Sequence, residues 1–369
     1  MPSNPFHYEI AADRWSFTDR EGILPRLEKL RDERGRRMLI YGRRRMGKTS
    51  LIHEAARRGR VTLIGEDLSG AGDLVTVANR LLALIPPPKD SILVRLLKKV
   101  GEIRFGDGKF SVTVRMEPKE QSKPGIEALR QALELMENYA ALEDNGLTVY
   151  FDEFQEIRGL VGDRAEWMLR SVIQHHKNLN YIFCGSDHRI VRWLTEPTAA
   201  FYKQLELIKV DPIDPQLLAD WIDERSKAGG LPTAAFGQEV VASVGPCTGD
   251  IIRLARTVFD LYAGRQTGNA IRAGIDAIAL REWHDEFAAR WHPLTSVQRG
   301  VLRALAKGLP PQSGDTIRLY HLNTAATAQT ALEALEEDRL VIRDERGKPI
   351  VDNPFFRRWI NAFDSTLPV

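Results

Sequence analysis

The sequence predicts an α/β fold with a parallel sheet, followed by an α-helical domain and a small C-terminal domain of helices and a hairpin. Strand-like apolar runs alternate with helix-like segments through the first 211 residues, which is the pattern of a parallel sheet with crossover helices. Beyond Val210 the strand-like runs stop, and helical apolar spacing continues to about Trp291. From Leu294 onward, three helix-like segments precede two short strand-like runs. Because 369 residues exceed a single typical core, two or three domains are expected.

Five strand-like runs make up the predicted sheet, and helix-like segments separate them. The runs are Met38–Tyr41, Val61–Ile64, Leu147–Phe151, Tyr181–Cys184 and Leu205–Val210. Between the second and third runs, Glu102–Val114 alternates polar and apolar residues around Gly-Asp-Gly, which predicts a β-hairpin inserted at about residues 100–117. Such a hairpin is either a surface for partner contact or a decoration of the core.

A glycine-rich segment, GRRRMGKTS at residues 42–50, follows the first strand and precedes the helix-like stretch Leu51–Ala56. It fits the pattern G-x-x-x-x-G-K-[ST] of a phosphate-binding loop, in which two glycines let backbone N–H groups close around phosphates. Here Lys48 reaches the β/γ oxygens, and the Thr49 hydroxyl can ligate Mg²⁺. The residues expected to bind the nucleotide are Gly42, Arg43, Arg44, Arg45, Met46, Gly47, Lys48, Thr49 and Ser50.

Two carboxylates, Asp152 and Glu153, follow the apolar run Leu147–Phe151. They therefore lie at the carboxyl end of a strand, where open α/β sheets place their ligands. An acidic pair in this position is often a solvated loop or a helix cap. Downstream of a phosphate-binding loop, we expect Asp152 to hold Mg²⁺ through water and Glu153 to polarise an attacking water. The adjacent Glu favours an enzyme that hydrolyses ATP over kinase-like and GTPase-like proteins.

An α-helical lid is predicted at residues 212–292. Its four segments with helical apolar spacing are Leu217–Lys227, Gly237–Val244, Asp250–Ala263 and Ala270–Ala289. At the start of the third segment, Asp250 can cap the helix, and Arg253 then projects about one turn into it. From this position Arg253 either reaches the γ-phosphate of a nucleotide beneath the lid or lies on a solvated helix face.

A winged-helix domain is predicted at residues 293–369. Its helices and hairpin are Thr295–Lys307, Thr316–His321, Asn323–Asp338, and Leu340–Arg343 with Pro349–Val351. Winged helices bind DNA or protein, but the helix that would enter the groove, Thr324–Thr330, carries no Arg or Lys and is followed by acidic residues. Because cations supply most of the electrostatic affinity for a duplex, sequence-specific DNA binding is expected to be weak. Three basic residues of the hairpin leave non-specific DNA binding open: Arg343, Arg346 and Lys348.

Composition sets the remaining limits. The net charge of +2 requires neither nucleic acid nor a membrane surface as partner, although Arg26–Arg60 forms a locally basic stretch. Cys184 and Cys247 lack the spacing of a zinc site or of a disulfide framework. No apolar run approaches the ~20 residues that span a bilayer. We expect a soluble cytoplasmic protein that does not contact a membrane.

Several motifs together resemble the archaeal-type ATPases of the STAND group, which are relatives of AAA+ enzymes. The segments that carry the resemblance are NPF (4–6), TDRE (18–21), GRRRMGKTS (42–50), FDEFQE (151–156), FCGS (183–186) and VDNPFFRRW (351–359). They extend over essentially the whole chain. The resemblance implies a P-loop NTPase of AAA+/STAND type, with an ATPase core at residues 1–211, the helical lid and the C-terminal winged helix.

The resemblance also assigns roles to single residues. By it, Lys48 and Thr49 contact phosphate and Mg²⁺, Asp152 and Glu153 serve the metal and the attacking water, and Ser186 is the polar sensor at a strand end.

The chain departs from the family at two places. The family often has a Gly-Arg pair before the fifth strand, where this chain reads Phe201-Tyr202-Lys203-Gln204. An arginine finger is therefore missing there, and Lys203 is a weaker substitute because it lacks the planar fork of Arg. In addition, Gly249–Arg253 looks like the lid sensor of origin-recognition and transposition AAA+ ATPases, which leaves a DNA-remodelling protein open as an alternative.

The leading expectation is an ATP-binding and ATP-hydrolysing molecular switch with slow basal turnover, whose lid position and assembly change with its nucleotide state. Its cofactors would be ATP and Mg²⁺. Its partner would be a second copy of the chain or a protein effector engaged by the winged helix. One alternative is a DNA-associated AAA+-like loader or transposition regulator. Another is a nucleotide-gated scaffold that binds ATP but scarcely turns it over.

Overall fold

The computed structural model divides into two compact units, the sheet unit (residues 17–213) and the helical unit (residues 3–7 and 214–363). The chain therefore passes between the units twice. The structure describes residues 3–7, 17–86, 101–106, 109–114, 124–142, 146–162, 165–186, 189–231, 235–264, 269–344 and 346–363.

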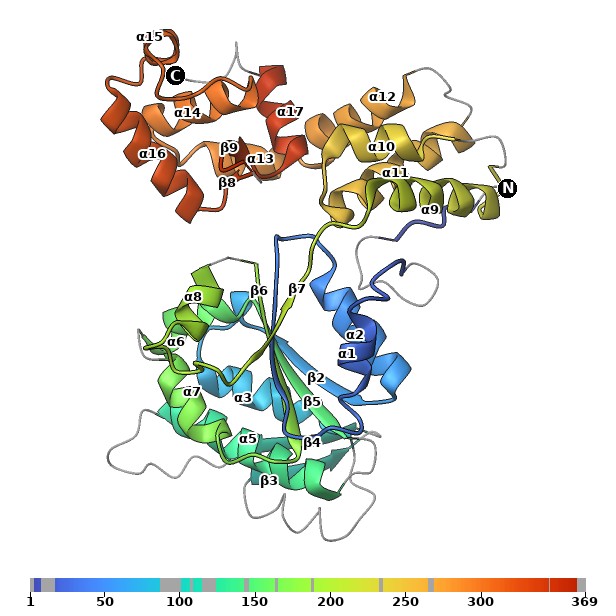
Figure 1. Ribbon diagram of the computed structural model, residues 1–369, viewed down its shortest axis with the longest axis vertical. Coiled ribbons are helices and arrows are strands. Elements are labelled where there is room, and N and C mark those ends of the chain that lie inside the picture. Colours follow the sequence, from blue (N-terminus) through green and yellow to red (C-terminus); the bar gives the residue numbers. More distant parts are fainter. Residues whose placement is uncertain are drawn as a thin grey trace. The chain divides into compact units, whose positions relative to one another are not determined.

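The sheet unit is built on a five-stranded sheet in which every pair of neighbouring strands is parallel, with the order β2-β5-β6-β1-β7 (Figure 1). The strands are β1 (Arg37–Tyr41), β2 (Thr62–Asp67), β5 (Leu147–Asp152), β6 (Leu179–Gly185) and β7 (Glu206–Lys209). All five predicted strands are confirmed. Because the strands are parallel, the carboxyl ends of β1, β5 and β6 meet at one edge of the sheet, which is where a ligand is expected.

Helices cover both faces of this sheet. Figure 1 shows α1 and α2 on one face and α3, α5 and α7 on the other. The helices are α1 (Leu24–Glu28), α2 (Lys48–Gly59), α3 (Leu74–Ala83), α5 (Pro124–Leu142), α6 (Ile157–Val161), α7 (Ala165–Ile173) and α8 (Arg189–Thr195), with short 3₁₀ turns η1 (Leu68–Gly70) and η2 (Phe154–Glu156). The rings of Phe151, Phe154 and Phe183 are fully buried and pack together in the core beneath the strand ends.

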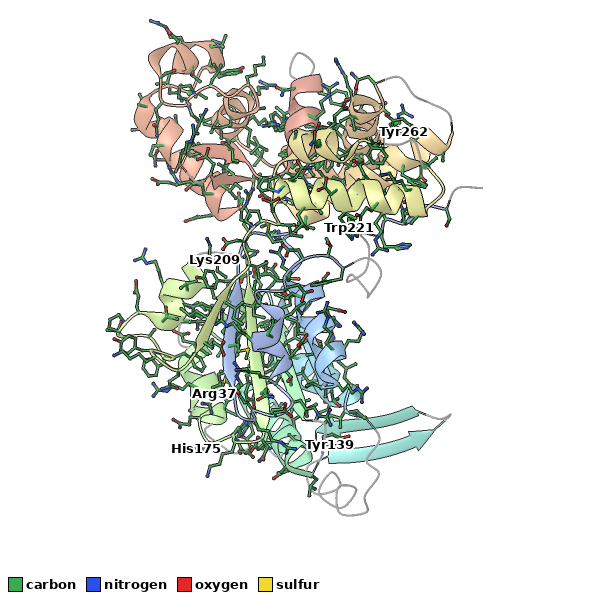
Figure 2. The ribbon with its side chains drawn as sticks, turned by 45° about the vertical axis from the view of Figure 1, so that its right-hand side comes forward. Arg37, Tyr139, His175, Lys209, Trp221 and Tyr262 are labelled. Carbon is green, nitrogen blue, oxygen red and sulfur yellow. The ribbon has the colours of Figure 1, made fainter. Side chains whose placement is uncertain are left out.

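The predicted inserted hairpin is confirmed as an antiparallel pair, β3 (Gly101–Gly106) and β4 (Lys109–Val114). It forms its own two-stranded sheet, and β4 lies against α3 and α5. Figure 2 shows it projecting from the sheet unit. Two of the three residues in the expected Gly-Asp-Gly turn, 107 and 108, lie outside the described residues.

The helical unit begins with α9 (Pro215–Ala228), α10 (Gly237–Val244), α11 (Thr248–Ala263) and α12 (Ala270–Ala277). The N-terminal residues 3–7, which the sequence assigned to the ATPase core, pack on α9 and α11. Phe6 is fully buried against the rings of Trp221 and Phe259, and the Asn4 amide donates to the Arg256 carbonyl and to Asp260. Trp221 is labelled on α9 in Figure 2.

The predicted continuous helix Ala270–Ala289 is wrong in one respect, because it is interrupted. After α12 the chain forms a five-residue π-helix, η3 (Ile278–Glu282), and α13 (His284–Trp291) starts beyond Trp283. A π-turn holds one more residue than an α-turn, so it changes the direction of the side chains that follow. Trp283 uses this change to place its ring edge-on against Phe287 and Phe355.

The winged helix is confirmed, with one element that the sequence did not predict. Its elements are α14 (Ser296–Ala306), α15 (Gly314–Tyr320), α16 (Ala325–Glu337), β8 (Val341–Arg343), β9 (Pro349–Val351) and the additional α17 (Pro354–Phe363). Asn353-Pro354 resembles a turn signal, yet Asn353 Oδ1 accepts from the backbone of Phe355 and caps α17. The α17 rings of Phe356 and Trp359 pack on α13. Among the described residues, no helix combines the length and apolarity that crossing a membrane requires.

Candidate active site

The phosphate loop connects β1 to α2 through several residues with left-handed backbone. Gly42 has φ +153°, and a Cβ there would lie 2.5 Å from the Val210 carbonyl oxygen, so only glycine fits. Gly47 has φ +81° at the start of α2, and Arg45 has φ +62°. Left-handed residues in succession turn backbone N–H groups toward a common centre, which is the geometry of an anion-binding concavity.

Lys48, the first residue of α2, lies almost fully buried inside this loop. Its Nζ donates to the carbonyl oxygens of Gly42 at 2.9 Å and Arg43 at 3.0 Å. Burial lowers the pKa of the ammonium, while the nearby carboxylates of Glu153 and Asp152 oppose that shift. The structure thus holds a cation at the centre of the loop, where the sequence predicted contact with phosphate.

Thr49 and Asp152 are brought together from positions 103 residues apart. The Thr49 hydroxyl donates to Asp152 Oδ2 at 2.6 Å, so the start of α2 touches the end of β5. A hydroxyl and a carboxylate side by side supply the hard oxygen ligands that Mg²⁺ prefers. These two residues therefore fit a magnesium ion that accompanies a bound nucleotide.

Glu153 is held from several sides directly after β5. Its backbone is left-handed, with φ 46° and ψ 46°, and its N–H donates to Asp152 Oδ1 at 2.9 Å. Its Oε2 accepts a hydrogen bond from Ser186 Oγ at 2.8 Å and another from the Gln155 amide. Its Oε1 lies 3.7 Å from Arg44 Nε of the phosphate loop. The strand ends of β5 and β6 and the loop thus converge on one carboxylate.

Sequence reasoning missed two residues of this region, Gln155 and Arg20. Arg20 is buried and donates to the Met46 carbonyl at 3.0 Å and to the Asp211 carbonyl at 2.6 Å, so it ties the loop to the end of the sheet unit. Burial lowers the pKa of this guanidinium. Both residues lie in motifs that the sequence analysis singled out, Gln155 in FDEFQE and Arg20 in TDRE. Neither motif indicates which groups its residue contacts.

A second contact follows the seam between α2 and β5. His53, one turn beyond Thr49, has its Nε2 3.1 Å from the Tyr150 hydroxyl. Gly65 makes room for this ring, since a Cβ there would lie 1.8 Å from Tyr150 Cε1. Burial raises the pKa of Tyr150 to about 12 and lowers that of His53. The pair fixes the helix against the strand beside the Thr49–Asp152 contact.

Arg253 lies in the helical unit and is not on a solvated helix face. Its side chain is 12% exposed, donates to Glu282 Oε2 at 2.6 Å and stacks 3.9 Å from the centroid of the Trp283 ring. Its contact with a γ-phosphate stays a prediction. The expectation that Asp250 caps this helix is wrong, because α11 starts at Thr248 with Cys247 as its N-cap. Asp250 lies in the first turn instead, where its charge still favours the helix N-terminus.

The chain is similar to known proteins in its C-terminal sequence and in its fold. Residues 285–362 match the model of a probable winged helix domain. No curated protein sequence matches the chain. The fold is similar to the Walker-type ATPase PABY2304 of Pyrococcus abyssi, with a TM-score of 0.66 and 17% identity over 94% of this chain and 97% of that one.

Two Aeropyrum pernix structures are also similar. The ORC2 protein in ADPNP–ADP complexes gives a TM-score of 0.58 and 16% identity over 95% of this chain and 94% of that one. The ORC1 protein in complex with DNA gives a TM-score of 0.51 and 15% identity over 95% of this chain and 93% of that one. Identities this low show the fold alone. The protein shares the fold of a Walker-type ATPase and of an ORC protein, and residues 285–362 form a C-terminal winged helix.

Proposed function

We propose that the protein is an ATP-dependent switch, similar to the archaeal-type ATPases of the STAND group, that binds ATP with Mg²⁺ and hydrolyses it. The observation that carries the proposal is the 2.6 Å contact between Thr49 and Asp152 beside the buried Lys48. It combines a cation for phosphate with oxygen ligands for a metal at one sheet edge. The fold shared with a Walker-type ATPase supports this proposal.

Each residue has its own task in this proposal. Lys48, which is bonded to two loop carbonyls, exchanges them for β/γ-phosphate oxygens. Thr49 and Asp152 would hold Mg²⁺, which would neutralise charge on the phosphates. Glu153 orients a water molecule and accepts its proton as the water attacks the γ-phosphorus, and the bond between the γ-phosphorus and the bridging oxygen breaks to release ADP. Ser186 holds that carboxylate in place through its hydroxyl. Little covalent chemistry is needed, because phosphoryl transfer depends mainly on positioning and charge.

The lid arginine connects nucleotide state to the rest of the helical unit in this proposal. To contact the γ-phosphate, Arg253 gives up its ion pair with Glu282 and its stacking on Trp283. The Trp283 ring also packs on Phe355 of α17, with ring centroids 5.5 Å apart. The exchange would therefore change the packing of Trp283 on α17 of the winged helix. We propose that a protein effector detects the nucleotide state by binding to the winged helix.

Slow basal turnover and assembly follow from the missing arginine finger. Phe201 of the divergent segment is buried, and Lys203 lies beside the ring of Tyr202 at 5.2 Å. We propose that a second copy of the chain or an effector supplies the finger, a contribution worth about 10³–10⁵ in rate. A specific activity that stays the same across a protein dilution series without effector would exclude assembly of identical copies as the source.

A DNA-associated ATPase is the second candidate, favoured by the exposed basic residues of the wing and by the fold shared with a protein solved on DNA. The basic stretch of the sheet unit argues against it, because part of its charge is neutralised internally. Arg57 and Arg58 both pair with Glu54, and Arg26 and Arg36 pair with Glu206. Any DNA binding is therefore proposed to be non-specific and salt-sensitive.

Phosphate release from ATP with Mg²⁺ tests the proposed function directly. We expect Glu153→Gln to retain ATP binding and to slow hydrolysis by roughly 10²–10⁴-fold, the usual effect of a positioned base. Glu156→Gln, three residues on in the same turn, is the matched control and should keep the wild-type rate. Hydrolysis that survives in Glu153→Gln but fails in Glu156→Gln would reassign the base. Tight ATP binding by the wild type without phosphate release would instead indicate the nucleotide-gated scaffold.

A further inference from the structure

Gln155 lies in η2, two residues beyond Glu153, and its amide meets the same carboxylate oxygen as Ser186. Both Gln155 Nε2 and Ser186 Oγ donate to Glu153 Oε2. The other oxygen, Oε1, is the one that lies 3.7 Å from Arg44 of the phosphate loop. Two donors on Oε2 therefore fix which oxygen of the carboxylate faces the loop.

The direction of the Gln155 amide is fixed by chemistry. An ionised carboxylate only accepts hydrogen bonds, so the amide must present its NH₂ group to Glu153. Its carbonyl oxygen Oε1 consequently points away, and it is buried without a hydrogen-bond partner among the described residues. Burial of an unpaired acceptor costs stability. A side chain kept in this unfavourable environment is more readily explained by what its amide does for Glu153 than by folding.

Gly185, at the end of β6, leaves the space that this arrangement needs. A Cβ at Gly185 would lie 3.1 Å from Gln155 Oε1 and 2.6 Å from Ile190 Cδ1. A larger residue would force Ile190 to move and would press on the Gln155 amide oxygen. The residues next to Ser186 and Glu153 thus contribute to one arrangement, in which Gly185 admits Gln155 and Gln155 orients Glu153.

We propose that Gln155 is a positioning residue for hydrolysis, which holds Oε2 of Glu153 so that Oε1 is presented to the attacking water. The proposal rests on the proposed function, because it concerns the same carboxylate. Gln155 touches neither nucleotide nor water in this role, so it acts on turnover and not on affinity. Displacement of a catalytic group by about 1 Å can cost 10²-fold in rate, which sets the size of the expected effect.

The test replaces Gln155 by Met, which has a similar length and no donor. We expect kcat to fall roughly 10- to 100-fold while ATP affinity, measured by calorimetry, stays within about twofold. In a Glu153→Gln background, the same change should slow the reaction by no more than about twofold, since the carboxylate that it orients is already gone. Gln131→Met is the matched control, because Gln131 makes the same kind of bond to Glu127 at 2.9 Å in α5. It should leave kcat unchanged.

Gly185→Ala gives a second test, since its added methyl group presses on the Gln155 amide oxygen, and on Ile190, without removing the amide. We expect Gly185→Ala to lower kcat, as Gln155→Met does, and to retain ATP affinity. A wild-type kcat in Gln155→Met, a loss confined to ATP affinity, or an equal fold-loss in the Glu153→Gln background would each overturn the inference and leave the proposed ATPase intact. Absence of phosphate release by the wild type would reject the proposed function, and the inference with it.

Discussion

The phosphate-binding region of the sheet unit and helix α16 of the winged helix use their polar side chains in opposite ways. In the sheet unit, side chains from three distant segments converge at one edge of the sheet: Lys48, Thr49, Asp152, Glu153 and Ser186. In α16, polar side chains bond mainly to residues three or four positions away. The contacts are Thr324 with Thr327 at 2.8 Å, Thr330 with the Ala326 carbonyl at 3.2 Å, and Gln329 with Glu333 at 2.6 Å.

The backbone shows the same difference. In the winged helix, two of the left-handed residues, His321 and Arg339, follow the ends of helices, where this conformation is an ordinary way to terminate. In the sheet unit, Glu153 is left-handed directly after a strand, and Arg45 is left-handed inside the loop. Such residues cost on the order of 1–3 kcal/mol each and gather at functional sites. Convergent polar groups on strained backbone indicate a ligand site, whereas locally satisfied ones indicate stabilisation of a domain.

Lys48→Ala gives the largest expected effect. It tests whether the convergent polar groups of the phosphate-binding region form a ligand site. The loop would lose the ammonium that the Gly42 and Arg43 carbonyls hold in place, so ATP binding should fall below detection by calorimetry with Mg²⁺. The control is Lys29→Ala, which removes an exposed lysine that pairs only loosely with Glu33 at 3.9 Å. ATP affinity unchanged in Lys48→Ala would mean that convergence at this edge does not mark a nucleotide site.

Arg253→Ala has an intermediate expected effect and tests whether a side chain of the helical unit also serves the site. Loss of one charge-assisted partner of the γ-phosphate should weaken ATP binding by about 1.5–3 kcal/mol and leave ADP binding nearly unaffected. The contacts that Arg253 makes with Glu282 and Trp283 reduce its contribution to ATP binding, since the γ-phosphate must compete with them. The ratio of ATP to ADP affinity is the measurement.

Glu282→Gln separates the two contributions of Arg253. It weakens the internal partner of the guanidinium and retains the guanidinium itself, so it should strengthen ATP binding if Arg253 exchanges between the two. An unaltered ratio of ATP to ADP affinity in both variants would make Arg253 a structural residue of the helical unit. Its polar contacts would then stabilise a domain, as those of α16 do.

Most of the fold could be predicted because its signals are local. Alternating apolar runs placed the five strands, and the loop pattern placed Lys48 and Thr49 at the start of α2. What the sequence could not indicate depends on distant contacts. The bonds of Arg20 to Met46 and Asp211 span 26 and 191 residues, and the packing of Phe6 on Trp221 joins the N-terminus to the helical unit. Such pairings leave no period or spacing in the sequence.

The candidate site shows the same limit at shorter range. The motif FDEFQE predicted two functional carboxylates, but the role proposed for Gln155 depends on Gly185 and Ser186 at the end of another strand. The break at Trp283 and the helix α17 were missed for a related reason. Both are stabilised by aromatic packing between segments about 70 residues apart, and this packing outweighs local helix and turn signals.

The wing of the winged helix gives the smallest expected effect and tests the other half of the comparison. Arg346 and Lys348 are exposed in the β8–β9 hairpin, while Thr324 and Gln329 bond to residues three or four positions away, at the N-cap and within α16. If α16 does not read bases, replacing both wing residues by Ala should weaken binding of any duplex by a similar, modest factor. The slope of log affinity against log salt concentration should become shallower by about 0.9 for each phosphate that the variant no longer neutralises.

The matched control for the wing removes the same charge from exposed positions of the sheet unit, Arg192 and Lys209. Binding is measured by titration of two unrelated duplexes at several salt concentrations. Equal reductions in affinity for both duplexes in the wing variant would agree with binding to the backbone alone, because phosphates carry no sequence information. A reduction confined to one duplex would show that the winged helix reads sequence. The local hydrogen bonds of α16 would then have to open on DNA, and the contrast between the two regions would hold only for the protein without its partner.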